Sequence, residues 1–411
     1  MTVRELLHDR GIHVEQGTST TLFDGRAPGI VARPTSTEQV AEIMRVAAEH
    51  DLTVAARGAG TKLTWGSPGE HLDVVVDLSA MNQVLAHEPG DLIVSTQAGC
   101  PLSAVQEACG AAGQRLALDE MVPGTTVGGL IATNPSGPLR VLAGTVRDLL
   151  IGVTIVLADG TIAHAGGRVV KNVAGYDLGK LLVGSYGTLA IVTEATFRLH
   201  PVPKATQWVT ATHSPDRLTQ VLGDLLHSQD APSAVEVRAT ANTSTEVAVL
   251  LEGTAAGVEQ RAGRVAALIG GAPADAPAWS VEYPWAVGDS IGLKITCQLS
   301  AVPQVLSVAT AAGWDIQGSA GAGVLYATPK QASDAGTENG TDHSADAVAD
   351  VAARLRTAAI GGSVIVLDAP RALRTEIDIW GPIPALAVMR RVKEQFDPDH
   401  RLAPGRFVGG I

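Results

Sequence analysis

The sequence predicts an α+β protein of two domains. Its 411 residues exceed what a single hydrophobic core usually accommodates. Short β-branched runs alternate with amphipathic helical segments as far as residue 200, and Pro201 and Pro203 interrupt that pattern before it resumes. We therefore expect an N-terminal segment at 1–28, a first domain at 29–200 and a C-terminal domain at 201–411.

The first domain is expected to mix strands and helices. Ser36, three residues before Gln39, is typical of a capping box, and the apolar residues that follow repeat at helical spacing. A strand at 52–56 leads into a glycine loop, and Asp159-Gly160 marks a hairpin turn. The other expected elements are strands at 74–76, 92–94 and 153–157 and a helix that starts at 102 and ends at Gly113.

The second domain repeats a helix–strand pattern. Ser214-Pro215 opens a helix whose apolar face is formed by Leu218, Val221, Leu222 and Leu225. We expect strands at 235–238, 247–251, 293–297 and 364–367, helices at 258–269 and 386–396, and a helix–strand–strand set at 302–327. This order suggests two ferredoxin-like βαβ halves on one sheet. The stretch 331–345 has no large apolar residue and is expected to be a disordered insertion.

Composition excludes several classes of protein. The net charge of −12 disfavours a nucleic-acid partner, which requires a basic face. The three cysteines, Cys100, Cys109 and Cys297, lack the spacing of a metal or iron–sulfur site and are expected to be small core residues. No run approaches the ~18 apolar residues of a membrane helix, and the charged N-terminus lacks a signal-peptide pattern, so we expect a cytoplasmic protein.

Two glycine-rich loops are suited to bind an anion through backbone amides. Gly58 and Gly60 follow a predicted strand, and Gly124, Gly128 and Gly129 lie at a probable helix N-terminus, where the dipole favours negative charge. Arg57 either adds charge or anchors its loop. A dinucleotide-binding fingerprint of the Rossmann type is excluded because its third glycine position is Leu63, and no P-loop motif occurs.

With these loops, the runs 169–178 and 184–194 resemble the FAD-binding domain of the vanillyl-alcohol oxidase / p-cresol methylhydroxylase (PCMH) superfamily. The Lys-Asn-Val-Ala-Gly-Tyr-Asp-Leu run at 171–178 narrows the resemblance to the FAD-binding E subunit of glycolate oxidase. This resemblance implies a PCMH-type FAD-binding domain of two α/β subdomains, followed by a C-terminal domain that, with the Pro404-Gly405-Arg406 tail, caps the flavin.

The resemblance also implies the cofactor-binding residues. Residues 57–61 and 124–129 would hold the pyrophosphate, 133–137 would continue that wall, the backbone near 191–192 would contact the cofactor, and 171–177 would line the flavin side. The implied cofactor-binding set is Arg57, Gly58, Ala59, Gly60, Thr61, Pro123, Gly124, Thr125, Thr126, Gly128, Gly129, Thr133, Asn134, Gly137, Gly175, Ile191 and Val192.

Two positions depart from the pattern of the relatives. Many relatives attach FAD covalently through His or Cys in the first loop, whereas this chain has Thr61 and Lys62 there, so we expect non-covalent FAD. Relatives usually carry Asn before the Pro-Gly of the tail, and here that residue is Ala403, which could remove one hydrogen bond to the flavin or its loop.

The implied activity is the flavin-dependent oxidation of 2-hydroxy acids such as glycolate to glyoxylate. Catalytic relatives carry a metal-associated His-x-Gly-Asp-type motif in the second domain; no histidine after residue 200 fits it, so we expect no metal site. The absence of this motif agrees with an E subunit that works together with a second flavin subunit and an iron–sulfur subunit. Any association with a membrane surface would then be through these partner subunits. The alternatives are a self-sufficient dehydrogenase of hydroxy acids or alcohols and a flavin-retaining assembly scaffold.

Substrate-binding residues are weakly indicated. Lys171 and Tyr176 could bind an acid, although Lys171 could equally form a local ion pair with Asp177. Four cations of the second domain are further candidates but are each expected to be exposed: Arg238, Lys294, Arg371 and Arg374. The Tyr283-Pro284-Trp285 segment is expected to be internal packing or a partner surface. No general base is assigned.

Overall fold

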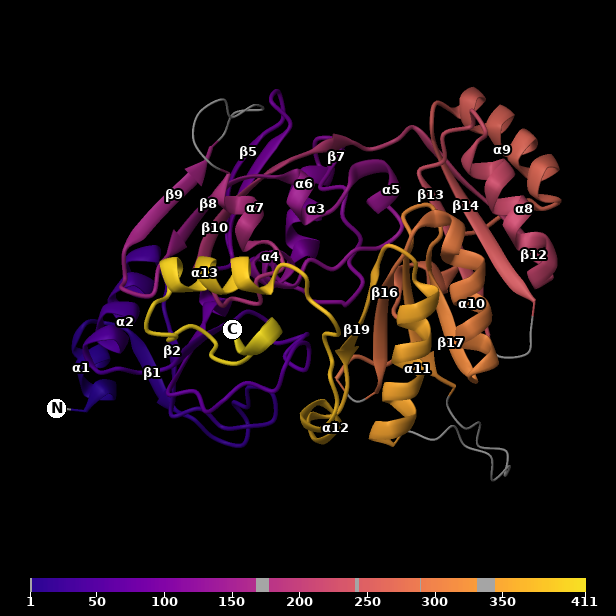
Figure 1. Cartoon of the computed structure of the whole chain (residues 1–411). Helices are drawn as coiled ribbons and strands as arrows, with labels where there is room; N and C mark the ends of the chain where they lie inside the picture. Colours follow the sequence, from indigo (N-terminus) through magenta and orange to yellow (C-terminus); the bar gives the residue numbers. More distant parts are fainter. Residues whose placement is uncertain (1, 168–176, 241–243, 289, 331–343) are drawn as a thin grey trace. The chain divides into compact units, whose positions relative to one another are not determined.

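The computed structural model describes residues 2–167, 177–240, 244–288, 290–330 and 344–411 and divides the chain into two compact units (Figure 1). Unit 1 comprises Met1–Pro135, Thr145–Val202 and Pro382–Ile411, and unit 2 comprises Ser136–Gly144 and Pro203–Gly381. The sequence analysis placed 382–411 in the C-terminal domain, but this segment packs within unit 1. The reason is a short parallel bridge: the Val54 N–H donates to the Arg401 carbonyl at 2.8 Å, and the Ala403 N–H donates to the Val54 carbonyl at 2.8 Å.

Unit 1 contains two main sheets. The first has the order β1-β2-β4-β3, with β2, β4 and β3 parallel, and the second is antiparallel with the order β5-β6-β10-β8-β9. A short pair joins β7 (Gln114–Arg115) to β11 (His200–Pro201). The first sheet consists of β1 (His13–Gln16), β2 (Ile30–Arg33), β3 (Val54–Arg57) and β4 (Val74–Asp77). The second consists of β5 (Val84–Glu88), β6 (Ile93–Gln97), β8 (Leu150–Val156), β9 (Ile162–Gly166) and β10 (Ile191–Arg198).

Helix α2 (Thr37–Glu49) contributes to the core that the two sheets share. The Ser36 side chain accepts a hydrogen bond from the Gln39 N–H, as expected, whereas the Gln39 amide oxygen bonds to Thr35 rather than completing a capping box. The predicted apolar face is fully buried with strand residues from both sheets. This cluster includes Val40, Ile43, Met44, Ala47, Val54, Val74, Val76, Val156 and Ile191. The burial of one apolar face explains why this helix forms where the periodicity predicts it.

The remaining helices of unit 1 are short, apart from the last. They are α1 (Val3–Asp9), α3 (Leu102–Gly110), α4 (Val127–Thr133), α6 (Val146–Leu149), α7 (Leu178–Leu182) and α13 (Leu386–Phe396). Figure 1 shows α13, in yellow, beside strands of unit 1 that come much earlier in the sequence. Among the described residues, no helix is both long and apolar enough to cross a membrane.

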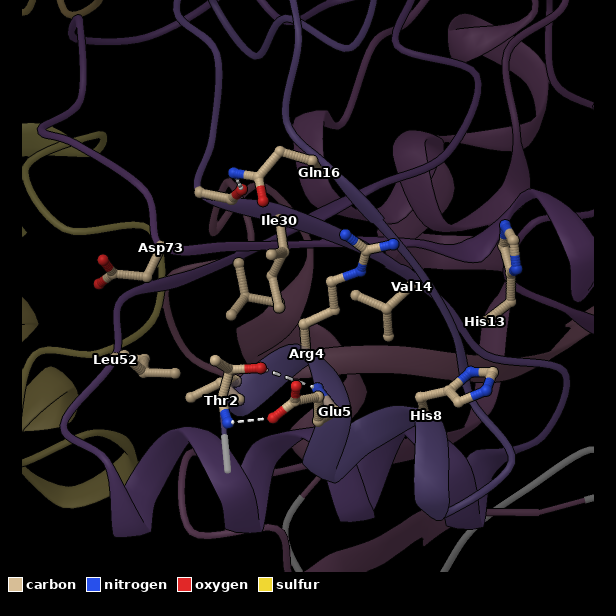
Figure 2. A pocket seen from close by; sticks show the side chains of 13 residues that line it. Thr2, Arg4, Glu5, His8, His13, Val14, Gln16, Ile30, Leu52 and Asp73 are labelled. Carbon is tan, nitrogen blue, oxygen red and sulfur yellow. Dashed lines mark hydrogen bonds between the residues drawn. The ribbon is translucent and has the colours of Figure 1, made fainter.

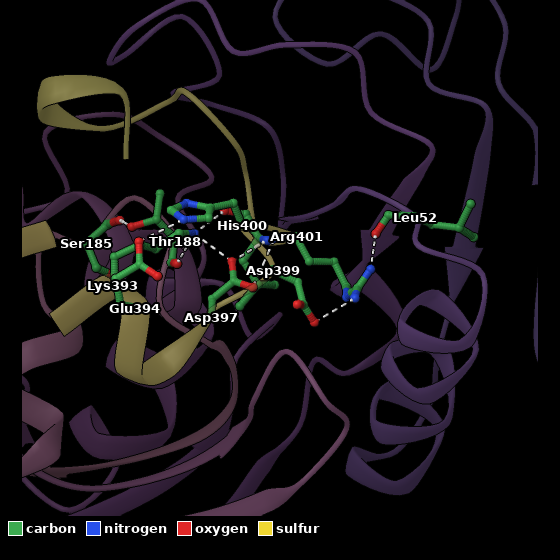
Figure 3. Close-up of polar contacts among 10 residues, drawn as sticks. Leu52, Ser185, Thr188, Lys393, Glu394, Asp397, Asp399, His400 and Arg401 are labelled. Carbon is green, nitrogen blue, oxygen red and sulfur yellow. Dashed lines mark hydrogen bonds and ion pairs between the residues drawn. The ribbon is translucent and has the colours of Figure 1, made fainter. Parts of the chain in front are cut away.

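A buried ion pair ties α13 to the rest of unit 1 (Figure 3). The side chains of Lys393 and Asp397 are completely buried, with Nζ and Oδ2 2.6 Å apart. The Lys393 ammonium also donates to the carbonyls of Thr188 (2.8 Å) and Leu402 (3.0 Å), and Asp397 accepts from the N–H groups of Arg401 and Leu402. The C-terminal segment and the glycine loop at 184–189 are therefore held by one polar network.

Unit 2 is built on a single antiparallel sheet of eight strands with the order β15-β12-β14-β13-β17-β18-β16-β19. In each half the strands follow the ferredoxin-like order, and the halves join edge to edge where β13 pairs with β17. The two expected ferredoxin-like halves are therefore present. The strands are β12 (Ala205–His213), β13 (Ala234–Ala239), β14 (Thr245–Gly253), β15 (Ala272–Ala274), β16 (Gly292–Thr296), β17 (Trp314–Ser319), β18 (Val324–Pro329) and β19 (Ser363–Asp368).

Four long helices cover one face of this sheet, and their apolar residues form one continuous core with alternate strand residues. The four residues predicted for the face of the first helix are all buried in that core. The helices are α8 (Pro215–Leu226), α9 (Ala255–Ile269), α10 (Val302–Ala311) and α11 (Ala345–Ala358); the short α12 (Arg371–Glu376) follows β19, and α5 (Arg140–Ala143) belongs to the inserted segment.

Several elements of unit 2 were not anticipated, among them strand β12 and helix α11. The nine-residue strand β12 was missed because its residues that pack on the core are Ala205, Val209 and Ala211, of which only Val209 is a strong strand former, so the apolar pattern is weak. Residues 331–343 of the predicted insertion lie outside the described residues, and its predicted C-terminal bound, residue 345, is wrong. Ala345 begins helix α11, and the Ser344 side chain caps that helix by accepting from the Ala347 N–H.

Candidate cofactor-binding site

The first glycine loop begins where β3 ends, and Arg57 holds it in place. The Arg57 guanidinium donates to Asp77 at the end of the neighbouring β4, with Nη2 2.8 Å from Oδ2. Arg33 contacts the same oxygen at 2.6 Å. Burial opposes ionisation of Asp77, but the hydrogen bonds from Arg57 and Ser79 outweigh it and lower its pKa. Of the two roles considered for Arg57, the structure therefore shows anchoring of the loop.

The second glycine loop leads into helix α4, whose first turn contacts the first loop. The Thr126 side chain caps the helix by accepting from the Gly129 N–H at 3.4 Å, and the Gly128 N–H donates to the Ala98 carbonyl at 2.7 Å. A Cβ at Gly58 would lie 2.1 Å from the Thr126 hydroxyl oxygen. Gly58 is thus required for the two loops to meet.

A groove of about 80 Å³ lies where the two loops meet. Eight of the expected cofactor-binding residues line it: Arg57, Gly58, Ala59, Gly60, Thr61, Thr126, Gly129 and Thr133. The structure thus brings together the core of the expected set. Pro123, Gly124, Thr125, Gly128 and Asn134 lie on the same loop and helix but do not line the groove.

The other expected residues are not part of this groove. Ile191 lies on β10 with its side chain in the core of unit 1, and Val192 follows it on the same strand. Gly137 belongs to the segment that packs in unit 2. Gly175, Lys171 and Tyr176 lie outside the described residues.

Eight residues of the groove were not in the expected set, and four of them carry an aromatic or charged side chain: Phe23, Lys62, Tyr186 and Arg406. The Arg406 guanidinium lies over the Phe23 ring at 4.9 Å, and its Nη2 donates to the Leu63 carbonyl at 2.6 Å. The signal for Lys62 was in the sequence: a lysine that directly follows a Gly-x-Gly-Thr loop.

Tyr186 and Ala403 have a left-handed backbone, with φ of 56° and 43°. Tyr186 lines the groove and stacks on Phe407 with ring centroids 5.5 Å apart. Bulky residues rarely adopt positive φ, and such strain clusters at functional sites. At Ala403 the same conformation gives a backbone reason for the asparagine of the relatives, since asparagine tolerates this region better than alanine.

The chemistry of the groove fits the diphosphate of a dinucleotide cofactor. Its lining combines two glycine loops, the threonines Thr61, Thr126 and Thr133, and the cations Arg57, Lys62 and Arg406. Among the described residues that line it there is no Asp or Glu that would repel an anion, and no His or Cys that could form a covalent bond to a flavin.

Unit 2 carries a second polar cluster on the sheet face opposite its helices. Tyr326 of β18 pairs in register with Lys294 of β16, so both side chains lie on that face. The Tyr326 hydroxyl donates to the Ser136 carbonyl at 3.0 Å, and Arg140 donates to the Ser136 hydroxyl at 3.0 Å. Burial, and then the charge of Arg140, lower the pKa of Lys294 to about 8. Two cations therefore lie near one another here.

Other residues considered for the substrate have structural roles. Arg374 was expected to be exposed, but it is buried and donates from Nε to the Ala369 carbonyl at 2.8 Å. Tyr283 and Trp285 are also buried: they stack at 4.9 Å, and the Trp285 indole donates to Asp368. Of the two roles considered for this segment, the structure shows internal packing. Arg238 and Arg371 are partly exposed.

A larger hollow lies elsewhere in unit 1. This hollow of about 890 Å³ near the N-terminus is lined by polar residues that include Arg4, Glu5, His8 and Asp73 (Figure 2). It contains none of the residues of the glycine loops. In the described parts of the chain, no three His, Cys, Asp or Glu side chains are grouped so that they could hold a metal ion.

The comparisons with known proteins identify the domain that carries the groove. Residues 28–166 match the family described as FAD binding domain, so the chain contains a PCMH-type FAD-binding domain. Over 211 residues the chain is 33% identical to glycolate oxidase subunit GlcD of Bacillus subtilis, covering 51% of this chain and 45% of that protein. It is 36% identical over 172 residues to a D-lactate dehydrogenase of Archaeoglobus fulgidus (42% and 39%) and 37% identical over 153 residues to glycolate oxidase subunit GlcE of Escherichia coli (36% and 43%). Each match spans less than half of the relative.

Solved structures extend the likeness to the whole fold. The chain superposes on a glucooligosaccharide oxidase from Acremonium strictum with a TM-score of 0.70 at 16% identity, covering 98% of both chains. An alkyldihydroxyacetonephosphate synthase superposes with a TM-score of 0.65 at 16% identity, covering 93% of this chain and 78% of that one. The PCMH-type fold with a C-terminal α+β part is thereby confirmed. That oxidase is described with a 6-S-cysteinyl, 8α-N1-histidyl FAD.

Proposed function

We propose that this chain is an FAD-dependent oxidoreductase that binds FAD non-covalently and takes part in the oxidation of a 2-hydroxy acid such as glycolate to glyoxylate. The observation that carries the proposal is the groove of unit 1, because it combines anion-binding loops with a matching FAD-binding domain. The named relatives, glycolate oxidase subunits and D-lactate dehydrogenases, favour a small hydroxy acid as the substrate.

The groove would hold the diphosphate of the cofactor. The N–H groups of the two loops and the start of helix α4 would donate to its oxygens, and Gly129 leaves that approach open. Arg57 would keep the first loop in position through its ion pair with Asp77 and would add positive charge to the groove. When bound, FAD supplies a flavin ring that accepts a hydride.

In unit 2, Lys294 and Arg140 would bind the carboxylate of the substrate. Neither cation forms a carboxylate ion pair among the described residues, and Arg140 further lowers the pKa of Lys294, so an anion would relieve their mutual repulsion. Tyr326 would fix the position of Arg140 through their shared partner Ser136.

We further propose that the chain works as the E-type subunit of a complex with a second flavin subunit and an iron–sulfur subunit. The E-subunit relative is 37% identical over 153 residues. Cys100 and Cys109 are buried free thiols, and burial raises the pKa of Cys109 to about 11. Such thiols are poor metal ligands, so an iron–sulfur cluster would belong to another chain. The D-lactate dehydrogenase relatives favour a second possibility, a self-sufficient dehydrogenase.

The test begins with the purified chain loaded with FAD. Acid precipitation is expected to release the flavin into the supernatant; flavin that stays in the pellet would refute non-covalent binding. The loaded chain is then mixed with glycolate and with D-lactate without oxygen while flavin absorbance is followed. Bleaching that needs the partner subunits supports the E-type role, and rapid bleaching of the isolated chain supports the self-sufficient dehydrogenase. Flavin that no substrate bleaches even in the complex would indicate an assembly scaffold, and a chain that cannot be loaded with FAD would refute the proposal.

A further inference from the structure

Lys62 places a buried ammonium group between the two glycine loops. Lys62 is only 6% exposed to solvent. Nζ donates to the hydroxyl of Thr61 on the first loop at 3.0 Å and to the hydroxyl of Thr125 on the second at 2.7 Å. The Thr125 hydroxyl in turn donates to the Val122 carbonyl at 2.6 Å, so its orientation is fixed to accept from Lys62.

This ammonium has no carboxylate partner. Among the described residues no acid lies within ion-pair distance of Nζ, and its contacts are two neutral hydroxyls and the Trp65 ring at 5.9 Å. Burying a charge without a counter-charge is costly, and natural cores avoid it. Burial accordingly lowers the pKa of Lys62 to about 7, against a smaller opposing effect of Glu120.

The lysine also lines the groove, together with Gly58, Gly60 and Gly129. The buried charge of Lys62 thus lies between the two anion-binding loops, at the groove proposed for the diphosphate. We propose that Lys62 is the counter-charge of the FAD diphosphate, and that FAD binding above neutral pH is coupled to the uptake of one proton by this lysine. The inference rests on the FAD site proposed above.

The direction of the pH dependence of FAD affinity follows from the protonation state of Lys62 in the protein without FAD. Below about pH 7 the lysine is already protonated, and FAD binding requires no proton. Above that pH the empty protein has lost the proton, and a bound dianion restores it, so the apparent affinity falls by up to tenfold for each pH unit. Glu120, Arg406, Tyr186 and the Arg57–Asp77 pair also face this region, so the effect is assigned to Lys62 by comparing the wild-type protein with variants at that position.

The experiment measures the Kd of the full-length apoprotein for FAD between pH 6 and pH 9, by quenching of flavin fluorescence. For the wild type, we expect a constant Kd up to about pH 7 and a rise above it. Lys62→Met is expected to weaken binding by about ten- to a hundredfold at pH 6, the loss of a charged hydrogen bond, and to show no such rise. Lys62→Arg keeps the charge at every pH and is expected to bind FAD with a flat profile. Lys204→Met removes an exposed lysine and is the matched control.

A purely structural role of Lys62 predicts different results. If Lys62 only held the loops together, Lys62→Met would lower the melting temperature of the apoprotein, whereas removal of an uncompensated buried charge is expected to leave it unchanged or raise it. Competition with ADP, which carries the diphosphate, should weaken in Lys62→Met, while competition with riboflavin should not. A wild-type protein that binds no FAD refutes the proposed function. Normal FAD binding by Lys62→Met with the wild-type pH profile, or a destabilised apoprotein with that profile, overturns this inference alone.

Discussion

The buried ion pair between Lys393 and Asp397 gives the sharpest prediction about stability. The perturbation is Asp397→Asn, which keeps the size of the side chain and removes its charge. The Lys393 ammonium would then remain fully buried without a counter-charge, with only neutral oxygens, such as the carbonyls of Thr188 and Leu402, as partners. Burial lowers the pKa of Lys393, and the charge and hydrogen bond of Asp397 oppose this shift.

The magnitude follows from the burial of both groups. Removing one partner of a buried ion pair costs about 3–5 kcal/mol, because the other charge is left uncompensated. For a unit of 150–250 residues, 1 kcal/mol shifts the melting temperature by about 2–4 °C, so unit 1 should melt about 6–20 °C lower. The matched control is Glu394→Gln on the same helix, where the ion pair with His400 is half exposed and should contribute at most about 1 kcal/mol.

The assay is thermal unfolding followed by circular dichroism, with the double variant Lys393→Met/Asp397→Asn completing the cycle. The double variant is expected to recover much of the loss, since no charge is then buried alone. A melting temperature of Asp397→Asn within 2 °C of the control, or a double variant that loses the sum of the two single losses, would refute the view that these two charges depend on one another.

Three further outcomes are expected. Gly129→Val should fold and lose FAD, because its Cβ has no protein atom nearer than 3.3 Å yet fills the groove, whereas Gly58→Ala should melt at a lower temperature, because its Cβ would lie 2.1 Å from the Thr126 hydroxyl oxygen. FAD titrations together with circular dichroism distinguish loss of binding from loss of folding. Normal FAD content in Gly129→Val would show that the second loop is only a structural turn. The difference in free energy of unfolding between the wild-type apoprotein and Lys62→Met, measured in urea, should rise between about pH 7 and pH 10.5. In that window Lys62 of the unfolded chain holds a proton that Lys62 of the folded protein has released, so a rise in pH favours the folded state. A difference that stays constant with pH would contradict the lowered pKa. Lys294→Met should raise the KM for glycolate by about tenfold or more with FAD content unchanged, measured in whichever assembly turns over; an unchanged KM would exclude Lys294 from carboxylate binding.

The sequence by itself determined the local elements and the loops that carry the chemistry. Apolar periodicity identified α2, α8 and α9 because each buries one face against a sheet, and that requirement is written into residue spacing. The glycine loops could be recognised for a similar reason: their backbone geometry depends on residues that are adjacent in the chain. Strand β12 was not predicted because strand pairing is not local and because its core-facing residues, apart from Val209, are too small to give a clear apolar pattern.

Only the tertiary structure decided which distant residues meet. The segment 382–411 joins unit 1 through a buried lysine and a bridge to β3, and nothing in its own composition specifies that partner. Tertiary packing likewise buried Arg374, which was expected to be exposed, and brought Arg406 to the groove. Lys62 shows the difference most clearly: its position after a glycine loop is a matter of sequence, but its 6% exposure and its contact with Thr125 of the second loop depend on how that loop folds back across the chain.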